Sequence, residues 1–213
     1  MPCKLFFGCM FASKTWHLRG DLNKWHDLKY RVCYISTTKD TRSFISHSSC
    51  EVKYNYAPFK LGSLTDFDYN AYDVIGVDEG QFHADLPTVL PTWLLAGKRV
   101  VIAALKATSE NKCFPIVANF ISFVTEFVHL EAICQSCLVE GKETPATMTR
   151  CLVEKTTDEL IGAHDEYVAV CLRHYYTPTL PSKLKRSMGA ANWPSPPTAA
   201  HSNTSAADMG YFI

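Results

Sequence analysis

Short apolar runs alternate with amphipathic stretches along most of the chain. The runs are rich in aliphatic, β-branched and aromatic residues, as buried strands are, and they lie at 4–7, 31–36, 72–79 and 99–105. Helices are predicted for the stretches that follow, at 18–28, 86–97 and 116–127. In the first and last of these, apolar residues recur every three to four positions, as on one face of a helix. This alternation predicts an α/β fold with a mostly parallel sheet and helices on both of its faces.

The last helical stretch and one unpatterned segment limit what periodicity can show. Ile116, Phe120, Phe123 and Phe127 share one helical face, and we expect them to pack in the core. Residues 43–68 contain proline and glycine breakers and give no clear assignment.

Residues 8–15, Gly-Cys-Met-Phe-Ala-Ser-Lys-Thr, join the first predicted strand to the first predicted helix. A strand, a tight loop ending in Lys-Thr and a helix form the context of a phosphate-binding P-loop. The helix N-terminus offers unpaired N–H groups and a partial positive charge to phosphate oxygens. Lys14 is then expected to reach the terminal phosphates, and the Thr15 hydroxyl to ligate Mg²⁺.

Ser13 departs from the P-loop pattern, which has glycine immediately before the lysine. Glycine is preferred there because a Cβ can crowd the phosphates or disallow the backbone angles. A strand, turn and helix without any ligand has the same local pattern. These eight residues alone therefore leave both phosphate binding and a bare turn open.

Two further segments end at the edge where an open parallel sheet binds ligands. The loop at 37–42 carries Arg42, whose guanidinium can fork onto phosphate oxygens, although a solvated loop fits the same residues. The run at 72–79 ends in Asp78 and Glu79, which is the Walker B pattern. In that pattern the first carboxylate faces the Mg²⁺ shell, and the second lies within reach of the nucleophile.

Two pairs of potential metal ligands follow, Cys134 with Cys137 and Cys171 with His174. Their C-x-x-C and C-x-x-H spacings supply four ligands of the type that binds structural Zn²⁺, while a redox pair is the alternative for a C-x-x-C motif. A long loop tied down at both ends by metal is typically a functional lid. Tyr167, at the end of that loop, is placed either to pack against the zinc lobe or to stack on a ligand.

Composition narrows the class of protein. Hydrophobic residues make up 47% of the chain, so a core can form, and the formal net charge of +0 argues against sequence-independent binding of duplex DNA. The chain has no apolar stretch near the ~20 residues of a membrane span and no signal-peptide pattern, so we expect no membrane association and an intracellular location. In a reducing compartment, nine cysteines indicate metal ligands and buried thiols rather than disulfides.

The chain is expected to divide into three parts. Residues 1–130 form the P-loop α/β domain that would bind ATP, and residues 131–176 form the zinc-binding lobe. From residue 177 the sequence is rich in Pro, Ser, Thr and Ala and poor in large apolar residues. Residues 177–213 are therefore predicted to be a disordered tail.

In their order, these motifs resemble type II thymidine kinases, the cytosolic family that many large DNA viruses also encode. The resemblance covers residues 4–176 and is carried by G-x-M-F-x-x-K-T from Gly8, K-D-T-R from Lys39, D-E-G-Q-F from Asp78, C-x-x-C from Cys134 and Y-x-x-x-C-x-x-H from Tyr167.

The resemblance implies a P-loop NTPase-type fold with a zinc-ribbon lobe carrying a lasso loop. It also implies transfer of the γ-phosphoryl group of ATP to the 5′-hydroxyl of thymidine or deoxyuridine, with catalytic Mg²⁺, structural Zn²⁺ and Glu79 as general base. The implied nucleotide-binding residues are Gly8, Met10, Phe11, Ala12, Ser13, Lys14, Thr15, Asp40, Arg42, Asp78 and Gln81. The implied nucleoside-binding residues are Met10, Phe82, Leu105, Phe114, Leu160, Gly162 and Tyr167, and the implied zinc ligands are Cys134, Cys137, Cys171 and His174. A homotetramer in the cytoplasm, that of the host cell for a viral protein, is also implied.

Ser13, Ser109 and Ala163 depart from the family pattern. They leave two alternatives: a deoxynucleoside kinase of broader specificity, and a nucleotide- and zinc-binding protein with impaired catalysis. The sequence also leaves open whether Thr144, Thr147 or Met148 of the lasso contacts the base.

Overall fold

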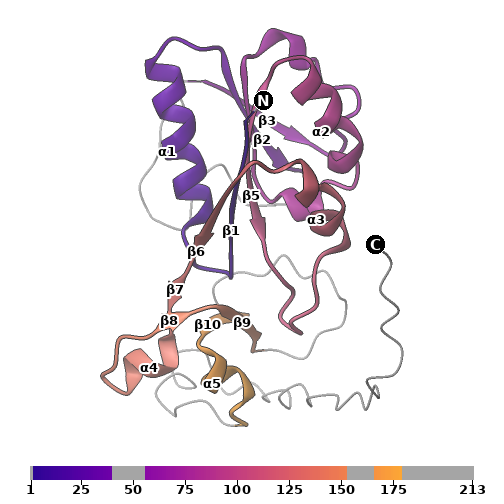
Figure 1. The fold of residues 1–213 in the computed structure, drawn as a ribbon. Helices are drawn as coiled ribbons and strands as arrows, with labels where there is room; N and C mark the ends of the chain where they lie inside the picture. The colour runs from indigo at the N-terminus through magenta and orange to yellow at the C-terminus, as the bar shows by residue number, and fades with distance from the viewer. Residues whose placement is uncertain (1, 40–55, 153–165, 179–213) are drawn as a thin grey trace, which may run out of the picture.

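The computed structural model describes residues 2–39, 56–152 and 166–178, and its main feature is a six-stranded parallel sheet (Figure 1). The strands follow the order β3-β2-β4-β5-β1-β6. Their bounds are β1 Cys3–Gly8, β2 Val32–Thr37, β3 Ala57–Leu61, β4 Val74–Val77, β5 Arg99–Leu105 and β6 Glu126–Leu130. The four strands predicted from apolar runs are confirmed.

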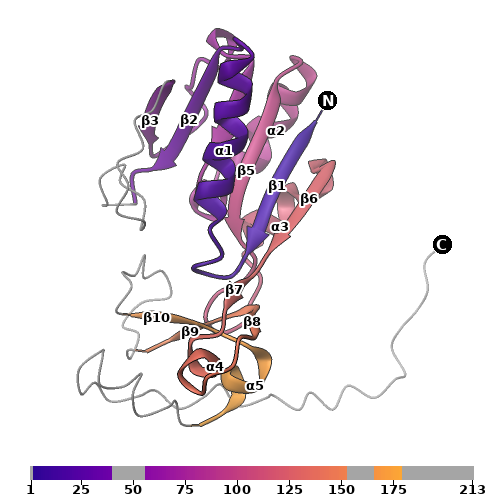
Figure 2. The same cartoon turned by 90° about the vertical axis from the view of Figure 1, so that its left-hand side faces the viewer.

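Helices cover both faces of this sheet, as predicted. Helix α1 (Lys14–Asp27) lies on one face, and α2 (Leu86–Leu95) and α3 (Pro115–Phe120) lie on the other (Figures 1 and 2). Neighbouring residues of β1 point to opposite faces, so Leu5 packs in the core under α2 and α3, and Phe6 packs in the core under α1. Each fully buried leucine on these faces contributes about 1.5–3 kcal/mol to folding.

One predicted helix is too long, and one strand was not predicted. The helix expected to run to 127 ends at Phe120, and a 3-10 turn, η3 (Ile121–Phe123), leads into β6 instead. Phe127 therefore lies in an edge strand with 55% of its surface exposed, although Phe120 is buried as expected. Strand β3 lies in the unassigned segment and was missed, because Ala57–Leu61 is only half-buried beside β2 and carries a proline.

A small second lobe lies beyond the carboxyl ends of the strands (Figures 1 and 2). Two antiparallel pairs, β7 (Ala132–Ile133) with β8 (Pro145–Ala146) and β9 (Met148–Cys151) with β10 (Tyr167–Val170), carry the short helices α4 (Gln135–Val139) and α5 (Leu172–Tyr176). Two more 3-10 turns, η1 (Tyr69–Ala71) and η2 (Gly80–Phe82), connect strands of the main sheet. The tail predicted for 177–213 lies outside the described residues from 179 onward.

The two lobes share a hydrophobic cluster. Cys9 and Ala12 of the loop after β1 pack with Val168 and Tyr175 of the small lobe. The loop after β1 therefore packs against the small lobe. Within the described residues, no helix has the length and apolar character that crossing a membrane requires.

Candidate active site and metal centre

The loop between β1 and α1 has the geometry of a phosphate cradle. Strand β1 ends at Gly8 and α1 begins at Lys14, so the N–H groups of the first helical turn face the loop. Lys14 Nζ donates a hydrogen bond to the Cys9 carbonyl across the loop, at 2.7 Å. Gly8 is required for packing, because a Cβ at this position would collide with the Leu130 carbonyl of β6.

Ser13 adopts a left-handed backbone conformation, with φ 56° and ψ 25°. This conformation explains why glycine suits the position, since it costs a residue with a Cβ about 1–2 kcal/mol. The loop nevertheless closes onto α1 with serine in place, and the His17 amide donates to the Ser13 carbonyl at 3.1 Å. The departure from the P-loop pattern is therefore a strained variant of the same turn.

Asp78 follows β4 and faces the beginning of α1. Its Oδ1 accepts hydrogen bonds from the Thr15 hydroxyl at 3.1 Å and from the Glu79 amide at 3.0 Å, and its Oδ2 accepts one from the Tyr34 hydroxyl at 2.6 Å. Burial, and then the nearby Glu79 carboxylate, raise the pKa of Asp78 to about 6 against the lowering effect of the Tyr34 and Thr15 hydroxyls. The residues predicted to share a Mg²⁺ shell thus lie together.

Glu79 is held by a chain of hydrogen bonds that starts on the neighbouring strand. The Leu105 amide of β5 donates to Gln81 Oε1 at 3.0 Å, and Gln81 Nε2 donates to Glu79 Oε2 at 2.6 Å. Glu79 itself has a left-handed backbone with φ 51°, a conformation that such sites tolerate when their surroundings fix it. The Glu79 carboxylate is therefore oriented at the carboxyl edge of the sheet.

Two aromatic side chains, Phe82 shortly after Glu79 in the chain and Phe114, pack together as an aromatic wall. Phe82 lies edge-to-face with Phe114, which precedes α3, at a centroid distance of 6.2 Å. Lys39 Nζ lies 5.8 Å from the centre of the Phe82 ring. Together with Leu105 at the end of β5, these rings provide an apolar surface of the kind on which a base or sugar can rest.

Two hydrogen bonds tie the loop after β1 to the small lobe. The Cys9 thiol donates to the Ala146 carbonyl at 3.2 Å, and the Met10 amide donates to the Thr149 hydroxyl at 3.0 Å. Sequence reasoning missed Thr149 and Tyr34. No sequence signal marks either residue, because their roles arise from which strands and lobes become neighbours.

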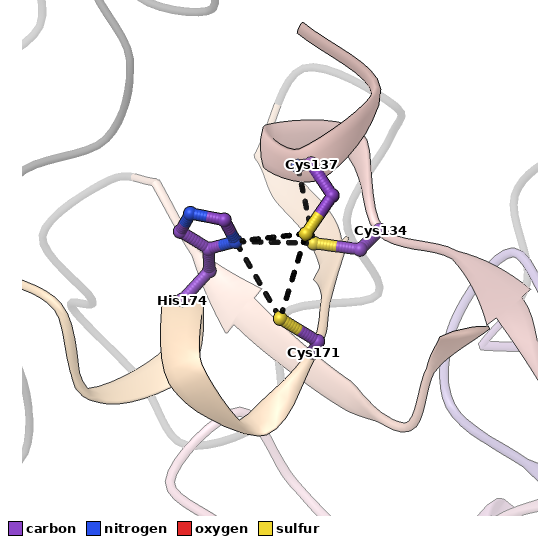
Figure 3. A group of neighbouring side chains, drawn as sticks. All are labelled: Cys134, Cys137, Cys171 and His174. Atoms are coloured by element: carbon purple, nitrogen blue, oxygen red, sulfur yellow. Dashed lines mark hydrogen bonds between the residues drawn. The ribbon is translucent and has the colours of Figure 1, made fainter. Parts of the chain in front are cut away.

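Cys134, Cys137, Cys171 and His174 form a four-ligand cluster in the small lobe (Figure 3). The Cys137 and Cys171 sulfurs are 3.8 Å apart, and His174 Nδ1 lies 3.4–3.5 Å from the three sulfurs. Zinc bonds of about 2.3 Å to sulfur and about 2.0 Å to nitrogen, at tetrahedral angles, place S···S pairs about 3.8 Å and S···N pairs about 3.5 Å apart. The ligand types and their spacing fit a zinc ion.

The remaining predicted site residues divide into those with a described position and those without. Tyr167 is buried in β10, and burial raises its pKa to about 12. Phe11 has a left-handed backbone in the loop after β1, with φ 63°, and Ala12 beside it is buried. Asp40, Arg42, Leu160 and Gly162 lie outside the described residues.

Comparisons with a family model and with individual proteins all point to one family. A family model described as thymidine kinase matches residues 1–175. The chain is 33% identical to "Thymidine kinase 1" of Dictyostelium discoideum, over 90% of this chain and 88% of that protein. It is 29% identical to a cytosolic thymidine kinase of Gallus gallus, over 89% of this chain and 81% of that protein. It is 30% identical to a raccoon poxvirus thymidine kinase, over 81% of this chain and 95% of that protein.

Proposed function

Because the chain belongs to the thymidine kinase family, we propose that it transfers the γ-phosphoryl group of ATP to the 5′-hydroxyl of thymidine and of deoxyuridine. The observation that carries the proposal is the position of Glu79. Its carboxylate is fixed by Gln81, and Glu79 lies in the chain between Asp78, which accepts a hydrogen bond from Thr15, and Phe82 of the aromatic wall.

The loop after β1 is proposed to bind ATP. The amides at the beginning of α1 hydrogen-bond phosphate oxygens, and Lys14 exchanges its contact with the Cys9 carbonyl for one with the terminal phosphates. Asp78 and Thr15 are the residues that would hold Mg²⁺, which neutralises charge on the phosphates when bound. Asp40 and Arg42 are proposed as further nucleotide contacts.

Glu79 is proposed to take the proton of the attacking 5′-hydroxyl. A free hydroxyl is a weak acid, so the proton moves to the carboxylate late, as the bond to phosphorus forms. Gln81 keeps Glu79 in place by donating a hydrogen bond to Oε2. Phosphoryl transfer then depends mainly on positioning and on charge neutralisation.

The nucleoside is proposed to lie between the aromatic wall and the small lobe. Met10, Phe82, Leu105, Phe114 and Tyr167 would enclose the sugar and base. Leu160 and Gly162 would supply backbone contacts that read the base edge. A buried site of this kind rejects a base whose hydrogen-bonding edge is wrong, because its own polar groups are then left unpaired.

Zinc is proposed to hold the small lobe in place, with Cys134, Cys137, Cys171 and His174 as its ligands. The protein is expected to contain about one zinc per chain. A homotetramer in the cytoplasm, as the family resemblance implies, stays a prediction, and two relatives carry the description cytosolic.

A side-by-side assay on thymidine, deoxyuridine and deoxycytidine tests the proposed function. We expect turnover on thymidine and deoxyuridine and at least about a hundredfold lower kcat/KM on deoxycytidine, because its donor and acceptor pattern is reversed at the base edge. A preference for deoxycytidine would contradict the proposal.

A kinase of broader specificity is the second candidate, and Ser109 is the observation that favours it. The Ser109 hydroxyl is buried and has no hydrogen-bond partner among the described residues, while its carbonyl accepts from the Tyr175 hydroxyl at 2.8 Å. A spare hydroxyl near the base could pair with a different base edge. Comparable kcat/KM on all three nucleosides would favour this candidate.

A further inference from the structure

Glu140 lies on the outer side of the His174 ring, away from the three cysteines. It is the residue at the C-terminal end of α4, and its Oε1 lies 3.1 Å from His174 Nε2. The other ring nitrogen, Nδ1, faces the sulfurs of Cys134, Cys137 and Cys171 (Figure 3). The imidazole is therefore fixed at both nitrogens, by the ligand cluster on one side and by a carboxylate on the other.

Hydrogen positions follow from this arrangement. A histidine nitrogen that binds a metal carries no proton, so in a neutral ring with Nδ1 as the ligand the proton is on Nε2. Nε2 then donates to Glu140 Oε1. Arg173 Nη2 lies 3.1 Å from the same nitrogen, but both atoms carry protons in this tautomer, so that contact is not a hydrogen bond.

Arg173 instead holds the carboxylate. Its Nη2 donates to Glu140 Oε2 at 2.8 Å, and Lys142 Nζ lies 3.9 Å from the same oxygen. These two cations hold the carboxylate in the position from which Oε1 accepts the hydrogen bond of His174 Nε2. Glu140 comes from the first C-x-x-C segment and Arg173 from the second pair, so their ion pair joins the two halves of the cluster.

We propose that Glu140 is the positioning residue of the metal centre, and that it fixes His174 as an Nδ1 ligand and strengthens zinc binding. This inference rests on the proposed zinc site. Carboxylates behind metal-bound histidines orient the ring and increase the basicity of the ligating nitrogen, and losing such a partner typically weakens metal binding 10–100-fold. His174 is 4% exposed, so water has little access to replace the carboxylate.

Zinc affinity of the full-length protein, measured by competition with a chromophoric chelator at constant pH, tests this role. We expect Glu140→Ala to bind zinc 10–100-fold more weakly than the wild type. Glu140→Gln keeps an oxygen that can accept a hydrogen bond from Nε2 but loses the charge. Its zinc affinity should therefore lie between those of the wild type and Glu140→Ala. Glu143→Ala, which removes an exposed carboxylate three residues after Glu140, is the matched control, and its zinc affinity should remain within twofold of the wild type.

A spectroscopic measurement separates positioning from misfolding. Cobalt-loaded Glu140→Ala should keep the absorption bands of a tetrahedral site with three sulfurs and one nitrogen, but should need more cobalt to reach them. Equal zinc affinity in the wild type and Glu140→Ala would overturn the role of Glu140 and leave the proposed zinc site intact. A folded wild type that binds no zinc would overturn both the metal centre and this inference, and neither result depends on kinase activity.

Discussion

Ser13 keeps the turn between β1 and α1 but does so with a strained backbone. It adopts φ 56° in a position where glycine is free of strain, and its side chain makes no capping hydrogen bond to α1. The Cβ is therefore the source of strain, and it lies where the phosphates of ATP are proposed to bind.

Replacing Ser13 with glycine should relieve this strain. We expect Ser13→Gly to raise the free energy of unfolding by up to about 1 kcal/mol, since the removed strain exceeds the added flexibility, and to raise turnover on thymidine. Ser13→Ala keeps the Cβ and should show neither gain. Chemical denaturation and steady-state kinetics measure both effects, and lower turnover in Ser13→Gly would contradict this account. If the parent were inactive and Ser13→Gly active, the impaired-enzyme alternative would hold.

His83 is a buried polar residue next to the active-site segment. It is fully buried, and the Asp78 backbone and the carboxylates of Asp85 and Glu79 are the polar groups around its ring. Burial lowers its pKa from the usual 6.5 because the charged imidazolium is poorly solvated there. The unfolded chain therefore takes up a proton near pH 6.5, while the folded chain does so only at lower pH.

The consequence is a loss of stability in mild acid. The contribution of His83 is fully present above pH 6.5 and decreases as the pH falls from there towards its lowered folded pKa. Between pH 7 and pH 5.5 this lowers the free energy of unfolding by up to about 1 kcal/mol. His83→Phe should lose less stability over the same interval. Urea denaturation at the two pH values checks this, and equal losses in both proteins would remove His83 as the cause.

At the scale of elements, the packing of α1 on the sheet depends on Gly76 in β4. A Cβ on Gly76 would overlap the isobutyl group of Leu22, which is fully buried in α1. The same glycine lies opposite Tyr34 in β2, whose hydroxyl holds Asp78 just beyond the end of β4. A disturbance at Gly76 would therefore also reach the residue that positions the Asp78 carboxylate.

Two glycine substitutions should change stability in opposite directions. Gly76→Ala is expected to lower the free energy of unfolding by about 1–3 kcal/mol through overpacking, and Leu22→Val should recover part of this loss in the double variant. Gly20→Ala, at an exposed position of α1 with no atoms near the added Cβ, should raise it by about 0.5–1 kcal/mol. Denaturation curves compare these three variants with the wild type, and a Gly76→Ala protein as stable as the wild type would show that α1 packs less tightly than described.

The sequence predicted the central strands of the sheet but not its edge strands. The runs at 4–7, 31–36, 72–79 and 99–105 were recognisable because a strand buried on both faces is continuously apolar. Strand β3 and Phe127 were not, because strands at the sheet edges are half-exposed and their pattern resembles a loop or a helix face. Thr149 and Tyr34 depend on which elements become neighbours, which local patterns do not encode.

At the scale of the whole molecule, the metal centre and the phosphate cradle belong to one packed unit. The hydrophobic cluster that contains Cys134 and Cys137 also contains Cys9 and Ala12 of the loop after β1. Hydrogen bonds from Cys9 and Met10 join that loop to Ala146 and Thr149. Order in the small lobe should therefore influence how the loop binds ATP.

Removing zinc should weaken ATP binding as well as stability. If the chelated protein loses one of the two hydrogen bonds to the loop, ATP affinity should fall by about fivefold, since a hydrogen bond contributes about 1 kcal/mol. The melting temperature should fall in the same sample. The chelator pre-saturated with zinc is the control, and unchanged ATP affinity in zinc-free protein would show that the two regions act independently.

The most direct test of the central claim is the turnover of Glu79→Gln on thymidine, measured together with its ATP affinity. The glutamine can still accept the hydrogen bond from Gln81, so the loop should keep its shape, but it cannot take the proton of the 5′-hydroxyl. We predict that turnover falls by 10²–10⁴-fold, with ATP affinity within about threefold of the wild type. Turnover within a factor of a few of the wild type would contradict the assignment of Glu79 as the base.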